Sequence, residues 1–449
     1  MRKLFGTDGI RGKAGEFPLN QETVMMLGRS IALQFKEKEG KNPKFIIGRD
    51  TRESGEWIEK AFHAGATTAG ASSLSAGVIT TPGVAFLTRK HDFDAGIVIS
   101  ASHNPYHDNG LKVFLPSGKK LGKDAESAIE MAVHSSEKIS PSGFGIDDSQ
   151  SIGFQSEYVS HLASEFKRLS LSGFKIVVDC ANGAASELAT GLFASFGADV
   201  IAINNKPDGK NINRDCGSLH LEKVQSKVLE EEADFGVAFD GDADRSLFVD
   251  EKGNLVDGDA TLWVMAQHLK KNGKLRGNRV VATVMSNIGL EIALNTLDVE
   301  LLRTDVGDKY VLEELQKRQA SVGGEQSGHI IFPSFSLVGD GMQTTLFLLE
   351  ALRENNKTLF EMSSGFRQYP QVLVNVKVKE KLPFEEVAEI AEKAGEVENA
   401  LGETGRLLLR YSGTENLARV MIEGEEQVEV ERLANDLARV IDSIIGEEA

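Results

Sequence analysis

The chain has 449 residues, of which 41% are hydrophobic and 26% charged, so we expect a globular protein with a sizeable core and about three domains. Its formal net charge of −17 argues against general binding to nucleic acid or to anionic membranes, so an anionic ligand would need local arginines. No apolar stretch is long enough for a membrane span, no signal peptide is indicated and only Cys180 and Cys216 are present, so we expect a cytoplasmic protein without a disulfide framework.

Three segments of the chain repeat one pattern of strand, helix, strand, helix and strand, with short apolar strands typical of burial on both faces. The first segment predicts a helix over 56–70 and strands over 44–48, 75–79 and 96–99. The second predicts a helix over 186–196 and strands over 174–178, 199–203 and 235–239. The third predicts a helix over 290–297 and strands over 279–284, 299–303 and 320–322. Such alternation is typical of parallel α/β layers.

The pattern changes near Gln371. The remainder predicts helices over 383–400 and 425–445 and strands over 373–378, 406–411 and 419–423. The predicted fold class is therefore α/β, with three topologically similar α/β domains, mainly parallel sheets and a small C-terminal α+β domain around a central cleft. The predicted domains span 1–150, 151–255, 256–368 and 369–449.

Each third strand of the repeat leads into a polar loop. The loops read SASHNP at 100–105, DGDADR at 240–245 and GGEQSGH at 323–329. Because ligands of open α/β sheets bind outside the carboxyl ends of the strands, we expect these three loops to line one cleft.

The DGDADR loop presents three carboxylates at alternate positions, Asp240, Asp242 and Asp244. Hard oxygen ligands of this kind suit Mg²⁺, and the small residues between them leave room for a cation. A calcium loop would need Glu251 as its twelfth residue, but a strand-like run intervenes, so this alternative is disfavoured. Arg245 would steady the carboxylates, bind phosphate or form a plain ion pair.

Ser102 lies on the first loop with His103 beside it, which suggests a serine hydrolase. However, adjacent side chains rarely point at one another, and the chain has no Gly-x-Ser-x-Gly elbow. A phosphorylated Ser102 that ligates Mg²⁺ together with the three aspartates uses both motifs, so we prefer that interpretation.

Other polar motifs complete the candidate site. Glu325 and Ser327 have groups that hydrogen-bond sugar hydroxyls, and His329 and Lys112 are candidates for proton transfer. Arg11, in a glycine-rich N-terminal loop, is a candidate to reach the phosphoserine. Near the C-terminus, the motif RYSGTE combines a cation, hydroxyls and backbone amides that can cradle a phosphate, with Arg419 as a possible assistant; its residues include Arg410, Ser412, Gly413 and Thr414.

These motifs, with MRKLFGTDGIRG at the start and TVMSN at 283–287, resemble those of the α-D-phosphohexomutases over essentially the whole chain and in the same order. The glutamine of GGEQSGH and the opening string are most similar to the branch that acts on glucosamine phosphates. Phosphoglucomutases and phosphomannomutases, which keep the same fold and mechanism, are the alternative.

The resemblance implies four domains around a central cleft, one bound Mg²⁺ and a phosphorylated Ser102. It implies interconversion of glucosamine 6-phosphate and glucosamine 1-phosphate through glucosamine 1,6-bisphosphate, toward UDP-N-acetylglucosamine and peptidoglycan. In this scheme Glu325 and Ser327 contact the sugar, while Arg410, Ser412 and Thr414 hold the phosphate that is not transferred. Members of the family are often homodimers, although no pattern in the sequence indicates one.

One departure from the family pattern is Asn416, which stands where the phosphate loop commonly has proline, so the rigidity of this loop is in question. Two further readings of the chain remain. A non-catalytic sugar-phosphate-binding protein would be expected to lack motif residues that are present here. A metal-dependent phosphatase would release phosphate.

Overall fold

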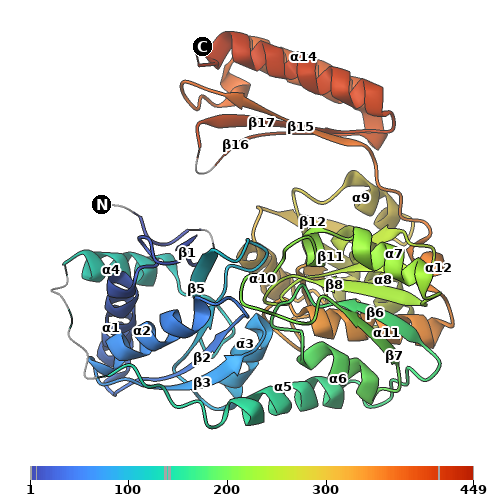
Figure 1. Cartoon of the computed structure of the whole chain (residues 1–449). Coiled ribbons are helices and arrows are strands. Elements are labelled where there is room, and N and C mark those ends of the chain that lie inside the picture. The colour runs from blue at the N-terminus through green and yellow to red at the C-terminus, as the bar shows by residue number, and fades with distance from the viewer. Residues whose placement is uncertain (1–2, 7, 136–138, 140–142, 413–414, 448–449) are drawn as a thin grey trace. The chain divides into compact units, whose positions relative to one another are not determined.

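The computed structural model of the chain describes residues 3–6, 8–135, 139, 143–412 and 415–447 (Figure 1). It divides into two compact units. Unit 1 comprises Met1–Val281 and Gly307–Ser363, and unit 2 comprises Ala282–Val306 and Ser364–Ala449. Among the described residues, no helix combines the length and the apolar character needed to cross a membrane.

The first sheet of unit 1 has the strand order β1-β5-β4-β2-β3. Its strands are β1 (Ile10–Lys13), β2 (Lys44–Arg49), β3 (Ser72–Val78), β4 (Ala95–Ile99) and β5 (Asp108–Phe114). The pairs β2–β3 and β2–β4 are parallel, as predicted. By contrast, β5 runs antiparallel to both β4 and β1, because a short loop of residues 100–107, which we call the serine loop, reverses the chain directly after β4.

The second sheet repeats this arrangement with the order β10-β9-β8-β6-β7. Its strands are β6 (Lys175–Asp179), β7 (Asp199–Ile203), β8 (Phe235–Phe239), β9 (Ser246–Asp250) and β10 (Leu255–Val256). β6 pairs in parallel with β7 and β8, whereas β9 runs antiparallel to β8 and β10. The sheets are therefore mixed rather than mainly parallel. The strand β9 also separates Glu251 from the aspartate loop, against a calcium-loop geometry.

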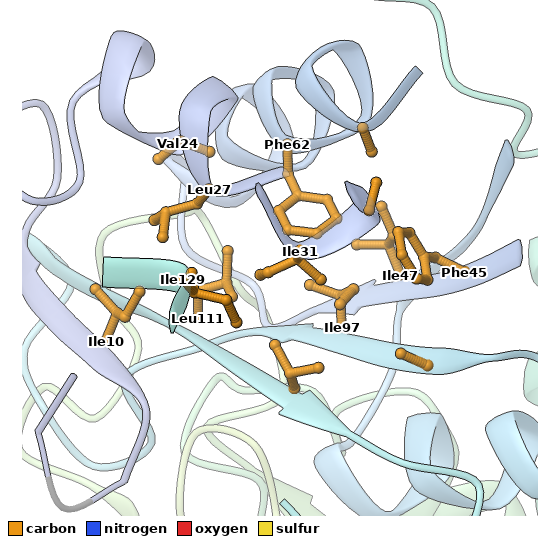
Figure 2. Packing of buried hydrophobic residues seen from close by; sticks show 14 of the residues in the cluster. Ile10, Val24, Leu27, Ile31, Phe45, Ile47, Phe62, Ile97, Leu111 and Ile129 are labelled. Carbon is orange, nitrogen blue, oxygen red and sulfur yellow. The ribbon is translucent and has the colours of Figure 1, made fainter. Parts of the chain in front are cut away.

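The core of the first domain joins its sheet to two helices, α1 (Gln21–Glu39) and α2 (Gly55–Thr67). Figure 2 shows Ile31 and Phe62 from these helices packed against Phe45, Ile47 and Ile97 of the sheet. The helices approach closely through two glycines: a Cβ at Gly28 would lie 2.1 Å from the Phe62 carbonyl oxygen, and one at Gly65 would lie 1.9 Å from the Met25 carbonyl oxygen.

The other helices of unit 1 lie beside its sheets or connect successive strands. They are α3 (Thr81–Lys90), α4 (Lys123–Ser135), α5 (Ser151–Glu165), α6 (Leu188–Ser195), α7 (Glu222–Glu230), α8 (Gly258–Lys271), α10 (Asp308–Arg318), α11 (Gly341–Asn355) and α12 (Leu359–Ser363). Cys180 and Cys216 are buried free thiols, and burial raises the pKa of Cys216 to about 12.

The third repeat departs from its predicted bounds. The strand predicted over 320–322 is wrong, because the short strand β13 (Gly323–Gly324) forms later and pairs antiparallel with β14 (Ile330–Ile331). The two glycines look like loop in the sequence, but they supply this pairing. β11 (Arg279–Thr283) spans the division between the units, and unit 2 holds α9 (Ile288–Asn295) and β12 (Glu300–Thr304).

The C-terminal part of unit 2 is a three-stranded antiparallel sheet under two helices (Figure 1). The sheet has the order β15-β17-β16, with β15 (Gln371–Lys377), β16 (Arg406–Tyr411) and β17 (Leu417–Glu423). The helices are α13 (Ala388–Leu401) and α14 (Gln427–Ile445), and a separate 3₁₀ turn at Phe384–Glu386 replaces the first turn of the predicted helix over 383–400.

Candidate active site

Ser102 lies in the loop that follows β4 and directly faces the aspartate loop. Its hydroxyl donates a hydrogen bond to Asp240 Oδ2 at 2.5 Å. Its backbone has a φ of 53°, which a non-glycine residue adopts only when neighbouring contacts hold it. Its amide donates to Ser100 Oγ at 2.9 Å, and Ser100 in turn donates to Asp50 Oδ2 at 2.6 Å.

Arg52 fixes the position of this serine loop, and it was not identified as a site residue from the sequence. Its side chain is fully buried and pairs with Asp50 at 2.9 Å. Its guanidinium donates to three carbonyl oxygens of the loop, those of Ser102 at 2.9 Å, Asn104 at 2.8 Å and Pro105, and to that of Asp108, the first residue of β5, at 3.0 Å. Asp50 and Arg52 directly follow the carboxyl end of β2, so the strand-end criterion could have found them if it had been applied to first strands as well as third strands.

Asp240, Asp242 and Asp244 follow β8 and form a compact acidic triad. Each offers one carboxylate oxygen, and these oxygens lie within 4.8 Å of one another; all three residues are buried. Asp242 Oδ2 accepts a hydrogen bond from the Thr81 hydroxyl at 2.6 Å, whereas its buried Oδ1 has no hydrogen-bond partner. Burial raises the pKa of Asp240 well above its usual value, and the charges of Asp244 and Asp242 add to this effect. A cation would satisfy these oxygens, so the triad can hold a metal.

Close packing explains one small residue of the triad loop, residues 240–245. A Cβ at Gly241 would lie 2.6 Å from the Ser102 carbonyl oxygen, so this glycine makes room for the serine loop. Ala243 has a φ of 53° and bends the loop between Asp242 and Asp244. The close approach at Gly241 is what lets Ser102 reach Asp240.

Lys112 on β5 lies against the triad, as expected for a site residue. Only 2% of its side chain is exposed, and its ammonium lies 3.1 Å from Asp242, 3.3 Å from Asp8 and 3.5 Å from Asp244. Burial alone would lower the pKa of Lys112, but the three carboxylates hold this pKa well above its ordinary value. Lys112 is therefore a firmly charged ammonium in this arrangement.

His329 is buried at the other side of Asp244. Its Nε2 accepts a hydrogen bond from the Gly339 amide at 3.2 Å, and its Nδ1 lies 3.6 Å from Asp244 Oδ1. Burial would lower the pKa of His329, but Asp244 and then Asp308 raise it above its usual value. The imidazole is thus oriented with Nδ1 toward the triad.

The remaining predicted residues of unit 1 lie near this centre, with partners of their own. Arg11 pairs with Asp8 at 2.6 Å, and the Arg245 amide donates to Asp240 Oδ1 at 3.2 Å. Glu325 Oε1 accepts a hydrogen bond from the Gly307 amide at 3.2 Å, and Ser327 is partly buried two residues further on.

His103 does approach Ser102, contrary to the expectation for adjacent side chains. Its Nδ1 lies 3.3 Å from Ser102 Oγ and 3.2 Å from Arg245 Nη1. Because a guanidinium only donates, Nδ1 accepts from Arg245, while the Ser102 hydroxyl donates to Asp240. Burial, together with Arg245 and Arg11, lowers the pKa of His103 to about 4. The contact does not form the hydrogen-bonded serine–base pair of a hydrolase.

Unit 2 carries the predicted phosphate loop between β16 and β17. Arg410 and Arg419 are direct cross-strand partners, an arrangement in which like charges repel unless an anion lies between them. Burial lowers the pKa of Arg410, and Arg419 adds to this effect, while the buried Nε of Arg419 has no hydrogen-bond partner. Ser412 is buried beside them, but Gly413 and Thr414 lie outside the described residues.

Sequence models of a known family match nearly the whole chain. They describe the phosphoglucomutase/phosphomannomutase α/β/α domains I, II and III and the C-terminal domain, at residues 2–140, 156–253, 257–369 and 373–440. The chain is 47% identical to a phosphoglucosamine mutase of Solibacter usitatus, over 99% of this chain and 100% of that protein. It is 48% identical to one of Caldicellulosiruptor saccharolyticus, over 99% of both chains.

Solved structures agree with this match at the level of fold. A phosphoglucomutase/phosphomannomutase family protein of Burkholderia thailandensis has a TM-score of 0.79 and 24% identity, over 98% of this chain and 97% of that chain. An N-acetylphosphoglucosamine mutase of Aspergillus fumigatus, solved with GlcNAc-6P and magnesium, has a TM-score of 0.69 and 19% identity, over 98% and 95%. Since all four domain models match in order and the full-length relatives share nearly half their residues with it, the chain belongs to the phosphoglucomutase/phosphomannomutase family.

Proposed function

We propose that this protein is a phosphoglucosamine mutase, an isomerase that interconverts glucosamine 6-phosphate and glucosamine 1-phosphate. Full-length relatives at 44–48% identity bear that name, which supports the amino sugar as substrate. The single observation that carries the chemistry is the hydrogen bond from the Ser102 hydroxyl to Asp240, a member of the buried acidic triad. It brings a potential phosphoryl carrier to a potential metal site.

The proposed metal is Mg²⁺, held by Asp240, Asp242, Asp244 and an oxygen of phosphorylated Ser102. The unpartnered buried oxygen of Asp242 supports this, because a buried carboxylate oxygen left without a donor is costly. When bound, Mg²⁺ supplies positive charge near the oxygens of the phosphoryl group.

In the proposed reaction the bond from phosphorus to Ser102 Oγ breaks, and the phosphoryl group bonds to the free hydroxyl oxygen of the bound sugar phosphate. The hydroxyl proton passes to a proton-accepting group of the site, and Ser102 Oγ takes up a proton. The product is glucosamine 1,6-bisphosphate, and the opposite phosphate then returns to Ser102. Lys112 and His329 are proposed to hold or move protons, while Arg245 and Arg11 offset charge on the phosphoryl oxygens.

Substrate binding is proposed for two groups of residues. Glu325 would accept hydrogen bonds from sugar hydroxyls, and Ser327 would accept or donate them. The phosphate that is not transferred would bind the residues of the RYSGTE loop and its cross-strand neighbour: Arg410, Ser412, Gly413, Thr414 and Arg419. The opposed arginines and the unpartnered Nε of Arg419 support an anion there.

We also propose a cytoplasmic location and the domain bounds 1–150, 151–255, 256–368 and 369–449.

A second candidate keeps the mechanism but changes the sugar. The matching domain models are those of phosphoglucomutase and phosphomannomutase, which act on other hexoses, so glucose or mannose phosphate is the alternative substrate.

The test is turnover of glucosamine, glucose and mannose 6-phosphates with Mg²⁺, on protein whose Ser102 phosphorylation is established by intact mass. We expect a strong preference for glucosamine 6-phosphate and loss of turnover in Ser102→Ala. Equal or faster turnover of another hexose phosphate would keep the mechanism and overturn the substrate. Normal turnover by Ser102→Ala would overturn the mechanism, and net release of inorganic phosphate would instead indicate a phosphatase.

A further inference from the structure

Five charged side chains of unit 1 and His329 close a ring beside Ser102, which we call the charge ring; the signs of the five charges alternate along it. Its members, in order, are Asp244, Lys112, Asp8, Lys120, Asp308 and His329. Successive members are separated by 3.5 Å for Asp244–Lys112, 3.3 Å for Lys112–Asp8, 2.5 Å for Asp8–Lys120, 2.6 Å for Lys120–Asp308, 3.8 Å for Asp308–His329 and 3.6 Å for His329–Asp244.

Within this ring, Lys120 joins two segments that are far apart in the sequence. Its ammonium bridges Asp8, in the loop before β1, and Asp308, the first residue of α10. It is brought there by a tight turn after β5: Leu115 donates its amide to the Lys119 carbonyl at 2.8 Å, and Lys120 forms a β-bridge with Phe114. Lys112 and Lys120 are therefore carried by one hairpin.

Each segment bridged by Lys120 supports a residue of the proposed reaction. The two carboxylate oxygens of Asp8 have different partners: Oδ1 pairs with Lys120, and Oδ2 pairs with Lys112 and Arg11. On the other side, Asp308 follows Gly307, whose amide donates to Glu325 Oε1. Gly307 has a φ of 132°, a conformation that favours glycine, so the position of this turn depends on the contacts made by its neighbours.

We propose that Lys120 is a positioning residue of the mutase reaction, which holds Asp8 against Lys112 and holds the start of α10 beside Glu325. The proposal rests on the proposed function. Without the Lys120 ammonium, the carboxylates of Asp8 and Asp308 have lost their shared counter-ion and repel each other. Asp8 then no longer covers Lys112 in one fixed place, and the Gly307 amide no longer holds Glu325.

The test compares Lys120→Met with Lys119→Met, the matched loss of the exposed neighbouring lysine. We expect Lys120→Met to lower kcat for glucosamine 6-phosphate by roughly 10-fold to 100-fold, as small misplacements of reacting groups do. Lys119→Met should keep the wild-type kcat. Lys120→Arg, which retains the charge, should recover part of the loss. Asp308→Asn in the Lys120→Met background should also recover part of it, because it removes one of the two repelling carboxylates.

A second readout needs no substrate. Lys112 is buried in the intact ring, so acetylation of folded protein, followed by peptide mass spectrometry, should label it slowly. Lys120→Met should speed labelling of Lys112 by a few-fold, because local opening becomes less costly, while Lys119→Met should not. If Lys120→Met is too unstable to purify, Asp308→Asn alone breaks the same bridge and should give both effects at smaller size.

The two proposals fail in distinguishable ways. If the wild-type protein turns over none of the three hexose phosphates, the proposed function fails, and the labelling of Lys112 still tests the positioning role. If the wild type is active, and Lys120→Met equals Lys119→Met in both kcat and labelling, the positioning role is overturned. A lowered melting temperature with unchanged kcat and labelling would likewise overturn it, because Lys120 would then be only structural.

Discussion

Arg52 shows how much of the candidate site depends on a side chain that takes no part in the chemistry. Its buried side chain donates to four backbone carbonyls, three in the serine loop and one at the start of β5, and pairs with Asp50. These bonds hold Ser102 in its left-handed conformation, with its hydroxyl toward Asp240.

We therefore expect Arg52→Met to destabilise the protein by about 3–5 kcal/mol, because it leaves Asp50 buried without its counter-ion. Arg52→Lys should also lose activity, since a single ammonium cannot donate to all the carbonyls that the planar guanidinium reaches. Urea denaturation and turnover of the hexose phosphates measure the two effects. The control is Lys60→Met, which breaks the exposed pair with Glu56 and should leave both unchanged. Wild-type stability in Arg52→Met would contradict the proposed support.

The acidic triad leads us to predict that Mg²⁺ stabilises the protein. Because Asp242 keeps a buried oxygen without a hydrogen-bond partner, Mg²⁺ should bind the folded state and raise its melting temperature. The stabilisation should reach roughly 3 kcal/mol when Mg²⁺ is present at 100 times its dissociation constant, and Asp242→Asn should remove most of it.

The matched control for the triad is Asp179→Asn. Asp179 is another buried carboxylate at a strand end, but both of its oxygens already accept hydrogen bonds, from Ala181 and Gly217 amides and the Asn204 side chain. Its replacement should leave the response to Mg²⁺ intact. Equal responses of Asp242→Asn and the wild type, measured by thermal melts over a Mg²⁺ titration, would exclude the triad as the metal site.

At the scale of single elements, the N-terminus of helix α11, which Asp340 caps, is hydrogen-bonded to the triad loop. Asp340 Oδ1 accepts the Gln343 amide at 3.0 Å, Oδ2 accepts the Tyr158 hydroxyl at 2.7 Å, and the adjacent Gly341 amide donates to the Ala243 carbonyl at 3.0 Å. Burial raises the pKa of Asp340 to about 6.

The raised pKa of Asp340 predicts how stability varies with pH. Between about pH 4 and pH 6 the folded state binds more protons than the unfolded state, so this group's contribution to stability falls as the pH rises through that window. Asp340→Asn does not titrate, so its stability relative to the wild type should rise by up to ~3 kcal/mol from pH 4 to pH 7.

Urea denaturation at several pH values measures this difference. Asn20→Ser serves as the control, because Asn20 caps α1 without carrying a charge and its effect should not depend on pH. A constant difference between Asp340→Asn and the wild type across the same range would show that Asp340 has an ordinary pKa in the folded protein.

The element scale also shows what the sequence could and could not predict. Strands buried on both faces form continuous apolar runs, and β2, β6 and β8 therefore lie within one residue of their predicted bounds. The antiparallel strand β5 was not predicted, because it includes Asn109, Gly110 and Lys112, which read as loop. β5 carries a polar residue because it supplies Lys112 to the candidate site.

The candidate site residues likewise divide into those that a local motif reveals and those that only the folded structure reveals. Ser102 and the three aspartates were predicted because each group sits on a recognisable loop at a strand end. Asp8, Lys120 and Asp308 were missed, since each is an ordinary charged residue in its own segment and acquires meaning only through the bridge that folding creates. The close approach at Gly241 could not be predicted for the same reason, because the carbonyl that it faces comes from another domain's loop.

At the scale of the whole molecule, the two sheets of unit 1 explain why the serine and triad loops can meet. Their orders, β1-β5-β4-β2-β3 and β10-β9-β8-β6-β7, place β4 and β8 in equivalent positions. Both loops therefore leave the carboxyl end of the same strand of a repeated fold. The contact between Ser102 and Asp240 then needs only the close approach that Gly241 allows.

The C-terminal part of unit 2 has a core of its own. The buried residues of this core all lie between Val376 and Ile445, and the strands of the sheet β15-β17-β16 all lie between Gln371 and Glu423. We therefore expect a fragment of residues 369–449 to fold by itself, with a cooperative thermal transition and dispersed amide resonances. Its stability should fall below that of the intact chain, since it loses the bond from Arg406 to the Ser286 carbonyl and that from the Asn287 side chain to the Tyr369 carbonyl.

A substitution within the fragment distinguishes folding on its own core from residual helix. Leu437 is fully buried in that core, whereas Val428 on the same helix α14 is 80% exposed. Leu437→Ala should destabilise the fragment by about 2–5 kcal/mol and could abolish its transition, while Val428→Ala should change little. A fragment that melts without cooperativity, or that responds equally to the two substitutions, would mean that this core forms only when the rest of the chain is present.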